Sequence, residues 1–322
     1  MSVTFDRASA IARTQPAVGV LQNSPEAKRR FYSYAAVLGV VVVGATAAVV
    51  WICRHGLSWI EISGFFLLYF MAAVGQGIGL HRYFSHKCFQ TSTTMRCLLA
   101  LLATMSVQGP IIEWVADHRR HHARSDECGD AHSPVIDNHC HTMTTWKGLW
   151  HAQLGWLFTD TSSDLHIFAK DLLQDRIVLF FSRTRLVWYF VSNVVIPGAY
   201  GHGLGGSEHA VGSILVAGML RTALFSQSVL ALNSIGHTFG STRFAQDNHS
   251  RNNALLAILT FGEGWHNNHH RFPRNAYAGL AWYEIDVLGT TITVLEKLGL
   301  VWNVVRNAKL DKKQPSPAPL VT

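Results

Sequence analysis

Two long apolar runs stand near the start of the chain. Residues 34–53 carry no charged side chain, and residues 59–80 carry one, Glu61, near their beginning. A helix rises about 1.5 Å per residue, so each run reaches about 30 Å, the thickness of the hydrocarbon core of a bilayer. Only residues 54–58 separate the runs. The pattern therefore predicts a tight helical hairpin that crosses a membrane twice.

Two later runs, 184–203 and 211–232, predict a second hairpin. The alternative for every run is a buried helix of a soluble protein. This alternative is strongest for residues 184–203, the weakest of the four runs. Residues 97–108 are apolar but too short to span, so we expect them to be buried or interfacial. The predicted fold class is an all-α integral membrane protein with four transmembrane helices in two hairpins and a cytoplasmic helical cap.

The Lys and Arg residues predict the orientation. Apart from Arg54 and Arg221, all of them lie in residues 1–33, 81–185 and 233–322. Because such residues stay on the cytoplasmic side, we expect both termini and both long polar segments in the cytoplasm. Arg221 falls inside the fourth run, where a charge is costly and needs a partner that the sequence does not identify.

The same pattern divides the chain into an arm, a membrane domain and a tail. The arm, 1–30, is polar and cytoplasmic, and the tail, 306–322, is rich in Lys and Pro and is expected to be disordered. The membrane domain, 31–305, contains the four spans. Its cytoplasmic cap comprises residues 81–183 and 233–305.

Composition agrees with a membrane protein. Of 322 residues, 48% are apolar and 15% are charged, and the mean hydropathy is +0.15. A disordered chain would have more charge and fewer apolar residues. Although the net charge is +7, charge is too scarce for a nucleic-acid binder. The cysteines are few and form no CxxC pair, so we expect all five to be reduced: Cys53, Cys88, Cys97, Cys128 and Cys140.

Histidine is unusually frequent, with 18 residues, and eight of them form three tight clusters. Residues at i, i+3 and i+4 share one face of a helix, so each HxxHH cluster presents three imidazoles to one point. The HxxxxH spacing fits better where a helix ends and the chain can bend. The clusters are His81 and His86; His118, His121 and His122; and His266, His269 and His270.

An all-nitrogen ligand set suits zinc, iron, copper or nickel. A structural zinc site takes four ligands and would not need eight, so two metals sharing the set is the economical explanation. Iron beside a membrane suggests O₂ chemistry on a lipid, which is an argument from chemical plausibility and not from spacing.

Five motifs give the chain a resemblance to a known family: GLHRYFSH (79–86), WVADHRRHH (114–122), NSIGHTFG (233–240), GEGWHNNHH (262–270) and WYEID (282–286). The chain resembles the membrane-bound fatty acid desaturases of the acyl-CoA Δ9, stearoyl-CoA-like type, in a bacterial form. The resemblance implies two iron ions held by His81, His86, His118, His121, His122, His237, His266, His269 and His270, with Asn233 reaching one metal through a water.

The implied reaction uses O₂ and two electrons to remove hydrogen from neighbouring methylenes of a saturated acyl chain, which leaves a cis double bond, Δ9-like in position. The electrons would come from an external ferredoxin, rubredoxin or cytochrome b5 with its reductase. Hydroxylation, acetylenation and terminal-alkene-forming decarboxylation remain alternatives on the same scaffold. A His-rich metal transporter is the alternative from another class, and it would need ionisable residues along a membrane path.

Other residues are assigned roles around this site. By resemblance, Trp146, Trp150 and Trp156 are expected to line a substrate tunnel, with a core aromatic cluster as the alternative. Ligating histidines normally donate their second N–H to an acceptor, so acids near them are candidates. The candidates are Asp117, Glu263 and Asp126, together with Asn267 and Asn268, which are adjacent to ligands. For Asp117 and Glu263 the alternative is an acid that stabilises a helix end.

The acyl carrier stays open. Acyl-CoA members of the family commonly carry an Arg where this chain has Ala116, and the segment after His132 is longer than in those relatives. CoA, acyl carrier protein and a membrane lipid are therefore all retained as carriers. A bacterial inner membrane is the expected location.

Overall fold

The computed structural model describes residues 17–306, so residues 1–16 and all but the first residue of the predicted tail lie outside it. The remaining part of the predicted arm is ordered. Strand β1 (Val20–Gln22) pairs antiparallel with β3 (Thr161–Ser163), with Val20 opposite Ser163. The chain just before the first long helix is therefore fastened to the base of the molecule.

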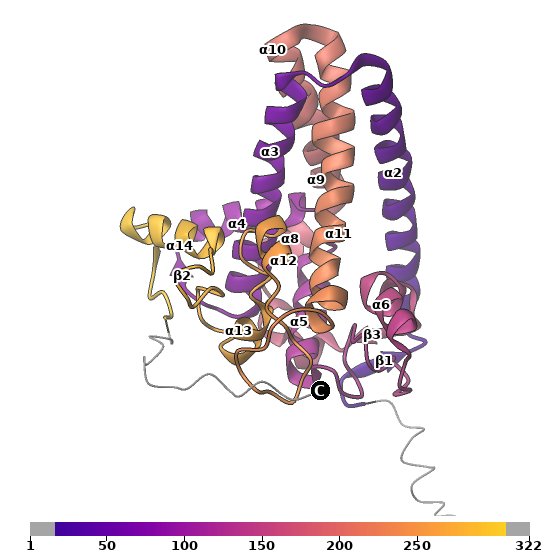
Figure 1. The fold of residues 1–322 in the computed structure, drawn as a ribbon, viewed down its shortest axis with the longest axis vertical. Helices are drawn as coiled ribbons and strands as arrows, with labels where there is room; N and C mark the ends of the chain where they lie inside the picture. The colour runs from indigo at the N-terminus through magenta and orange to yellow at the C-terminus, as the bar shows by residue number, and fades with distance from the viewer. Residues whose placement is uncertain (1–16, 307–322) are drawn as a thin grey trace, which may run out of the picture.

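A column of long helices rises from a broad base (Figure 1). Helix α2 (Pro25–His55) begins at Ser24, whose side chain accepts a hydrogen bond from the Ala27 backbone N–H. Helix α3 (Trp59–Ala73) begins with a capping box between Ser58 and Glu61, and it continues into the π-helix η1 (Val74–Ser85). Helices α2 and α3 thus follow one another across residues 56–58, and the second continues through η1 into the base.

The second apolar stretch folds back on itself. It comprises α9 (Arg185–Phe190), η4 (Val191–Val195), α10 (Ile196–Ser213), η5 (Ile214–Leu220) and α11 (Arg221–Ser234). Gly206 has φ 80°, which breaks the helix at the top of the column (Figure 1). Within residues 17–306, three helical stretches are long and apolar enough to cross a membrane: Pro25–His55, Trp59–Ser85 and the folded-back Arg185–His237.

Arg221 is fully buried and has backbone partners. Its guanidinium donates to the Ala217 carbonyl at 3.1 Å and to both the carbonyl and hydroxyl oxygens of Ser192 at 3.1 Å. Ser192 lies in η4, where a π-helical carbonyl expects a donor five residues on, and that residue is Pro197, which has no N–H. Arg221 therefore supplies the donor that proline removes.

The base is built from short helices and two small two-stranded sheets (Figure 1). Strand β2 (Gln90–Thr91) pairs with β4 (Val301–Trp302). The helices are α4 (Thr93–Met105), α5 (Ile111–Arg124), α6 (Thr145–Gln153), η2 (Gly155–Phe158), α7 (Leu165–Phe168), η3 (Lys170–Leu172), α8 (Arg176–Arg183), η6 (Ile235–His237), α12 (Ala254–Leu259), α13 (His266–Arg271) and α14 (Val287–Lys297).

Close packing between η1 and α4 fixes the end of the first hairpin. A Cβ at Gly75 would lie 2.1 Å from the Leu102 carbonyl oxygen, and one at Gly79 would lie 3.0 Å from that of Leu99. The side chain that faces Gly79 from α4 is the small, buried Ala103. Glycine is therefore required for this approach. The segment predicted to be too short to span forms most of α4, and it is partly buried beside η1.

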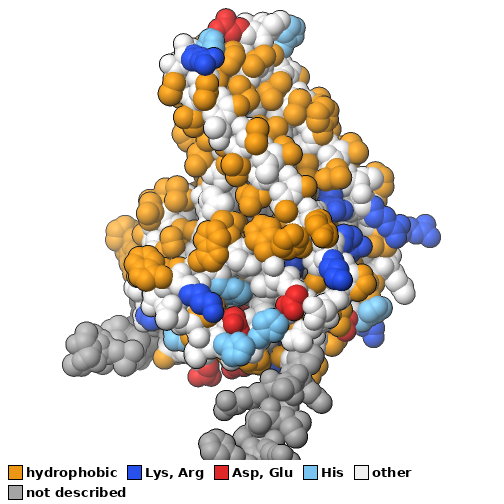
Figure 2. Space-filling view, turned by 90° about the vertical axis from the view of Figure 1, so that its right-hand side faces the viewer, with side chains coloured by type: hydrophobic (Ala, Val, Ile, Leu, Met, Phe, Trp, Pro, Cys, Tyr) orange, Lys and Arg blue, Asp and Glu red, His pale blue; other side chains and the backbone are white. Residues whose placement is uncertain are grey.

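The two ends of the molecule differ in surface chemistry. Figure 2, which views the side on which α2 lies in Figure 1, shows hydrophobic side chains over the column and charged or histidine side chains at its tip and around the base. This distribution is the one expected for a column placed in hydrocarbon.

Candidate dimetal site and acyl cavity

Four elements of the base carry the clustered histidines to one place. His81 lies in η1 and His86 directly follows it, and α5 carries the second cluster. His237 ends η6, and α13 carries the third cluster. Segments about 190 residues apart in sequence thus meet, as the 3.0 Å separation between the Nε2 atoms of His81 and His269 shows.

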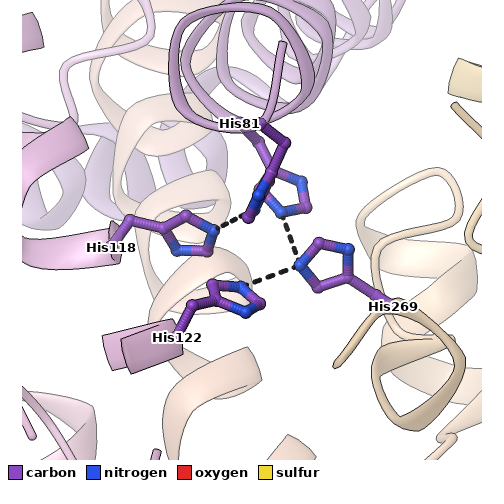
Figure 3. Close-up of side chains that lie close together, drawn as sticks. His81, His118, His122 and His269 are labelled. Carbon is purple, nitrogen blue, oxygen red and sulfur yellow. Dashed lines mark hydrogen bonds between the residues drawn. The ribbon is translucent and has the colours of Figure 1, made fainter. Parts of the chain in front are cut away.

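The nine histidines form two groups. Within each group the nitrogen atoms that could bind a metal lie within 4.8 Å of one another. Figure 3 shows His81, His118, His122 and His269 turned toward a common centre. The first group is His81, His86, His118, His122 and His269, and the second is His121, His237, His266 and His270.

A π-helix explains the HxxxxH spacing. The His86 backbone N–H donates to the His81 carbonyl at 3.1 Å, which is the i→i+5 bond of a π-helix. This winding places residue i+5 close above residue i, and the two imidazole rings lie 4.9 Å apart. The pair stands at the end of a helix, as expected, and the wider winding of that helix brings the two rings together.

Three carboxylates orient the rings. His121 Nδ1 lies 2.9 Å from Asp130, His237 Nδ1 lies 2.8 Å from Asp126, and His81 Nδ1 contacts Glu263. A proton on each Nδ1 is assigned from these contacts, so each Nε2 presents a bare lone pair. This is the arrangement by which proteins hold metal-binding histidines.

The donor set fits cations. The Nε2 of His237 lies 3.0 Å from that of His266, and the Nε2 of His81 lies 3.0 Å from that of His269. Because His237 and His81 carry their proton on Nδ1, the lone pair on the Nε2 of each faces the partner ring at close range. A metal ion placed between such nitrogens turns this crowding into ligation.

Burial keeps these rings in the form that binds metal. Burial first, and neighbouring imidazoles second, lower the pKa of five rings well below the ordinary value, namely those of His118, His122, His266, His269 and His270. Burial alone would raise the pKa of the Asp130 carboxyl, but the adjacent His121 lowers it below its usual range. His121 is the exception among the shifted ligands, because burial alone would lower its pKa but the adjacent Asp130 carboxylate raises it. The site therefore combines five rings held neutral by burial with an ionised carboxylate.

A cavity of about 390 Å³ leads away from the first group. Its wall includes His118, Asn233 and Trp156 at the base, and it continues between α2 and α11 toward Val49. The lining is mostly apolar, which suits an alkyl chain. Asn233 thus lines the same cavity as a histidine of the first group.

The family follows from comparison with known proteins. Residues 57–289 match the family model described as fatty acid desaturase. The chain belongs to the fatty acid desaturase family. It is 40% identical over 82% of its length to a hex-5-enoyl-[acyl-carrier protein] acetylenase of Moorena producens (strain JHB), covering 83% of that protein. It is 35% identical over 80% of its length to an sn-1 stearoyl-lipid 9-desaturase of Anabaena variabilis, covering 87% of that protein.

A third relative comes from Synechocystis sp. (strain ATCC 27184 / PCC 6803 / Kazusa). This sn-1 stearoyl-lipid 9-desaturase is 31% identical over 77% of the present chain, which covers 72% of it. The predicted family is therefore confirmed, and the chain is an oxidoreductase that acts on fatty acyl chains. Membership in an enzyme family leaves the metal-transporter alternative without support.

The acids near the histidine clusters take different roles. Glu263 and Asp126 contact ring nitrogens, as a supporting role requires. Asp117 does not, which corrects its assignment: its carboxylate accepts from the Ser163 hydroxyl at 2.5 Å and lies 3.6 Å from the Arg30 guanidinium. Asp117 therefore joins α5 to β3 and α2.

Asn267 and Asn268 hold backbone segments and contact none of the ligating rings in the part of the chain described. The side chain of Asn267 accepts from the Arg243 and Phe244 backbone N–H groups, each at 2.8 Å. That of Asn268 donates to the Ala278 carbonyl and to Glu284. Both residues fix α13, and their assignment as direct partners of the ligands is corrected.

The sequence did not reveal Asp130, and His132, which we expected at the surface as a histidine outside the motifs, is buried. Asp130 lies in an irregular segment nine residues after His121, so no helical spacing relates the two. Its carboxylate also accepts from the backbone N–H groups of Asp126 and His132. The His132 ring lies 4.3 Å from that of His121, and His132 lines the cavity. The only signal for Asp130 in the sequence was an acid in the segment that follows the second histidine cluster.

Of the three tryptophans predicted to line a tunnel, one lines the cavity. Trp156 lies in the cavity wall and is buried. Trp146 and Trp150, on α6, lie outside the wall, with exposed fractions of 83% and 64%. Their assignment to a tunnel is therefore corrected, because α6 turns these two side chains away from the cavity.

Two cysteines are not free. Cys128 and Cys140 form a disulfide that closes the segment carrying Asp130 and His132. The expectation of five reduced cysteines is therefore wrong for this pair, while Cys53, Cys88 and Cys97 are free thiols. Spacing alone could not reveal the pair, because irregular backbone brings the two residues together.

Proposed function

We propose that this protein is an O₂-dependent di-iron fatty acyl desaturase that introduces a cis double bond, Δ9-like in position, into a saturated acyl chain. One observation carries the proposal: two adjoining groups of histidines lie in the base, and His118 of the first group lines an apolar cavity that continues between the apolar helices α2 and α11. The first group and the second group would each hold one iron, with Asn233, which lines the same cavity as His118, reaching one of them through a water. The family supports this chemistry.

The protein's own residues position the acyl chain and exclude water from the site. The two irons, when bound, supply the oxidising power of O₂ with two electrons from an external donor. An alkyl chain offers no polar handle, so the shape of the wall must choose the carbon that faces His118 and Asn233. Buried Trp156 and Leu157 close the wall at the base and exclude water.

Acetylenation is the second candidate. The relative that is 40% identical is a hex-5-enoyl-[acyl-carrier protein] acetylenase, and its reaction removes hydrogen in the same way from a chain that already has a double bond. The ligand groups serve both reactions alike. The acyl chain that reaches the site decides between the two reactions: a saturated chain would give an alkene, and a chain that already has a double bond would give an alkyne.

We further propose four membrane crossings, with residues 31–305 as the membrane domain. The break at Gly206 supports two crossings within the third apolar stretch. With the histidine groups in the base, the base and both termini would be cytoplasmic at a bacterial inner membrane. The electron donor would be a separate ferredoxin, rubredoxin or cytochrome b5, docking at the base.

A fatty-acid profile tests the reaction. The intact chain and His266→Ala are each expressed, with a ferredoxin and its reductase, in a host that lacks its own oxygen-dependent desaturase, and total fatty acids are measured by GC–MS. A new monounsaturated acid made only by the intact chain is the expected result. A new acetylenic acid would favour the second candidate. The same profile from both chains would contradict the proposal.

A further inference from the structure

The upper part of the cavity is a groove along one face of α2. Its lining residues on this helix recur at helical spacing over about 18 Å, more than half the thickness of the hydrocarbon core. Across the groove stand residues of η5 and α11, including Leu220 and Ala223. The α2 residues are Val37, Leu38, Val41, Val42, Ala45, Thr46 and Val49.

The groove is open on its outer side. Val42 and Val49 line it and yet have exposed fractions of 53% and 52%. At the base, by contrast, His132 and Trp156 line the same cavity with exposed fractions of only 5% and 6%. The cavity is thus closed toward the cytoplasmic base and open at the level of the predicted hydrocarbon core.

The opening is a built feature of the helix pair. Beside it, α2 packs tightly on η5, where a Cβ at Gly44 would lie 2.6 Å from Met219. At its lower end α2 is fastened to the base, since Arg30 donates to the backbone carbonyls of Trp156 and Thr161. The helix is held both beside and below the groove, so the separation from α11 between these points is part of the fold.

We propose that an acyl chain enters this groove sideways from the bilayer, so that the substrate is an acyl chain carried by a membrane lipid. This inference rests on the proposed desaturase function and names its substrate class. A lipid has a second chain that is strongly favoured to stay in hydrocarbon. An open side wall admits one chain while the other stays in the bilayer, whereas a closed tunnel would require the whole lipid to leave it.

The test uses the iron-loaded protein in lipid nanodiscs with a ferredoxin and its reductase. One arm contains discs of distearoyl phosphatidylglycerol, and the other contains discs of dioleoyl phosphatidylglycerol with stearoyl-acyl carrier protein in solution. Ala45→Trp fills the groove. Val43→Trp is the matched control, because Val43 lies on the same helix, 70% exposed and outside the lining. Iron content is measured for every variant.

The expected result is unsaturation of the disc lipid, reduced at least tenfold by Ala45→Trp and unchanged by Val43→Trp, with equal iron content. A phospholipid with a diazirine in mid-chain should also label the groove residues Val41 and Ala223 in the wild type and label them much less in Ala45→Trp, while labelling of the lipid-facing Val43 stays the same. Conversion of stearoyl-acyl carrier protein but not of the disc lipid would overturn this inference and leave the proposed desaturase function standing. Equal rates in the two variants would overturn the side entrance. No product from either carrier would overturn the proposed function itself.

Discussion

At the scale of single residues, the site depends on carboxylates that hold rings in one orientation. Asp130, Asp126 and Glu263 each contact a different histidine, and together they serve both ligand groups. The sequence motifs predicted all nine histidines of the two ligand groups, because the motifs are specific. They missed Asp130, because the distance from His121 is set by irregular backbone and not by helical repetition.

Removing Asp130 should weaken metal binding without removing a ligand. In Asp130→Ala, His121 loses the acceptor that fixes its Nδ1 proton, and such losses lower metal affinity by about 10–100-fold. We expect purified Asp130→Ala to lose most of the iron bound to the second group, measured by mass spectrometry of bound metal, with desaturation falling in parallel.

Asp160→Ala is the control for this prediction. Asp160 forms an exposed pair with His139, away from the ligand groups, and such pairs contribute little. Its iron content and activity should equal those of the wild type. Wild-type iron content in Asp130→Ala would show that the carboxylate does not support the site.

At the scale of elements, the π-helical winding of η1 and its close packing on α4 position His81 and His86. The sequence predicts a span over residues 59–80, but the period of an α-helix does not explain His81 and His86 on one side. The π-helix η1 does, and glycines within it let α4 approach closely. Apolar runs predict that a helix exists, whereas its winding depends on neighbours that the sequence does not locate.

A side chain at Gly75 should disrupt this packing. In Gly75→Ala the new Cβ would meet the backbone of α4 at 2.1 Å, so the helices must separate, at a cost of at least about 1–3 kcal/mol. We expect little monodisperse protein and a lower melting temperature in detergent. Gly39→Ala is the matched change in α2, where nothing lies within 4 Å of the new Cβ, and it should behave as wild type. Equal stability of the two variants would contradict the packing argument.

At the scale of the whole molecule, a column of apolar helices stands on a base that holds the metal ligands (Figure 1). The runs and motifs predicted this division, and the hairpin break at Gly206 agrees with it. The cavity could not be predicted in the same way. It forms between α2 and α11, far apart in sequence, and Trp146 and Trp150 lie outside it because α6 turns them outward.

The proposed orientation predicts where tags are accessible. In spheroplasts treated with protease, tags at both termini should survive, while a tag inserted at Gly206, at the opposite end of the column, should be cleaved. Permeabilised cells, in which all three tags are cleaved, provide the control. Cleavage of a terminal tag in intact spheroplasts would reverse the proposed orientation.

The central claim is that nine histidines hold two metal ions. The most direct measurement is the metal content per chain of protein purified without chelators, by inductively coupled plasma mass spectrometry, with Mössbauer spectroscopy of iron-57-labelled protein to report the iron environment. The account predicts close to two irons per chain in nitrogen-rich sites. One metal per chain, or zinc in place of iron in active protein, would contradict it.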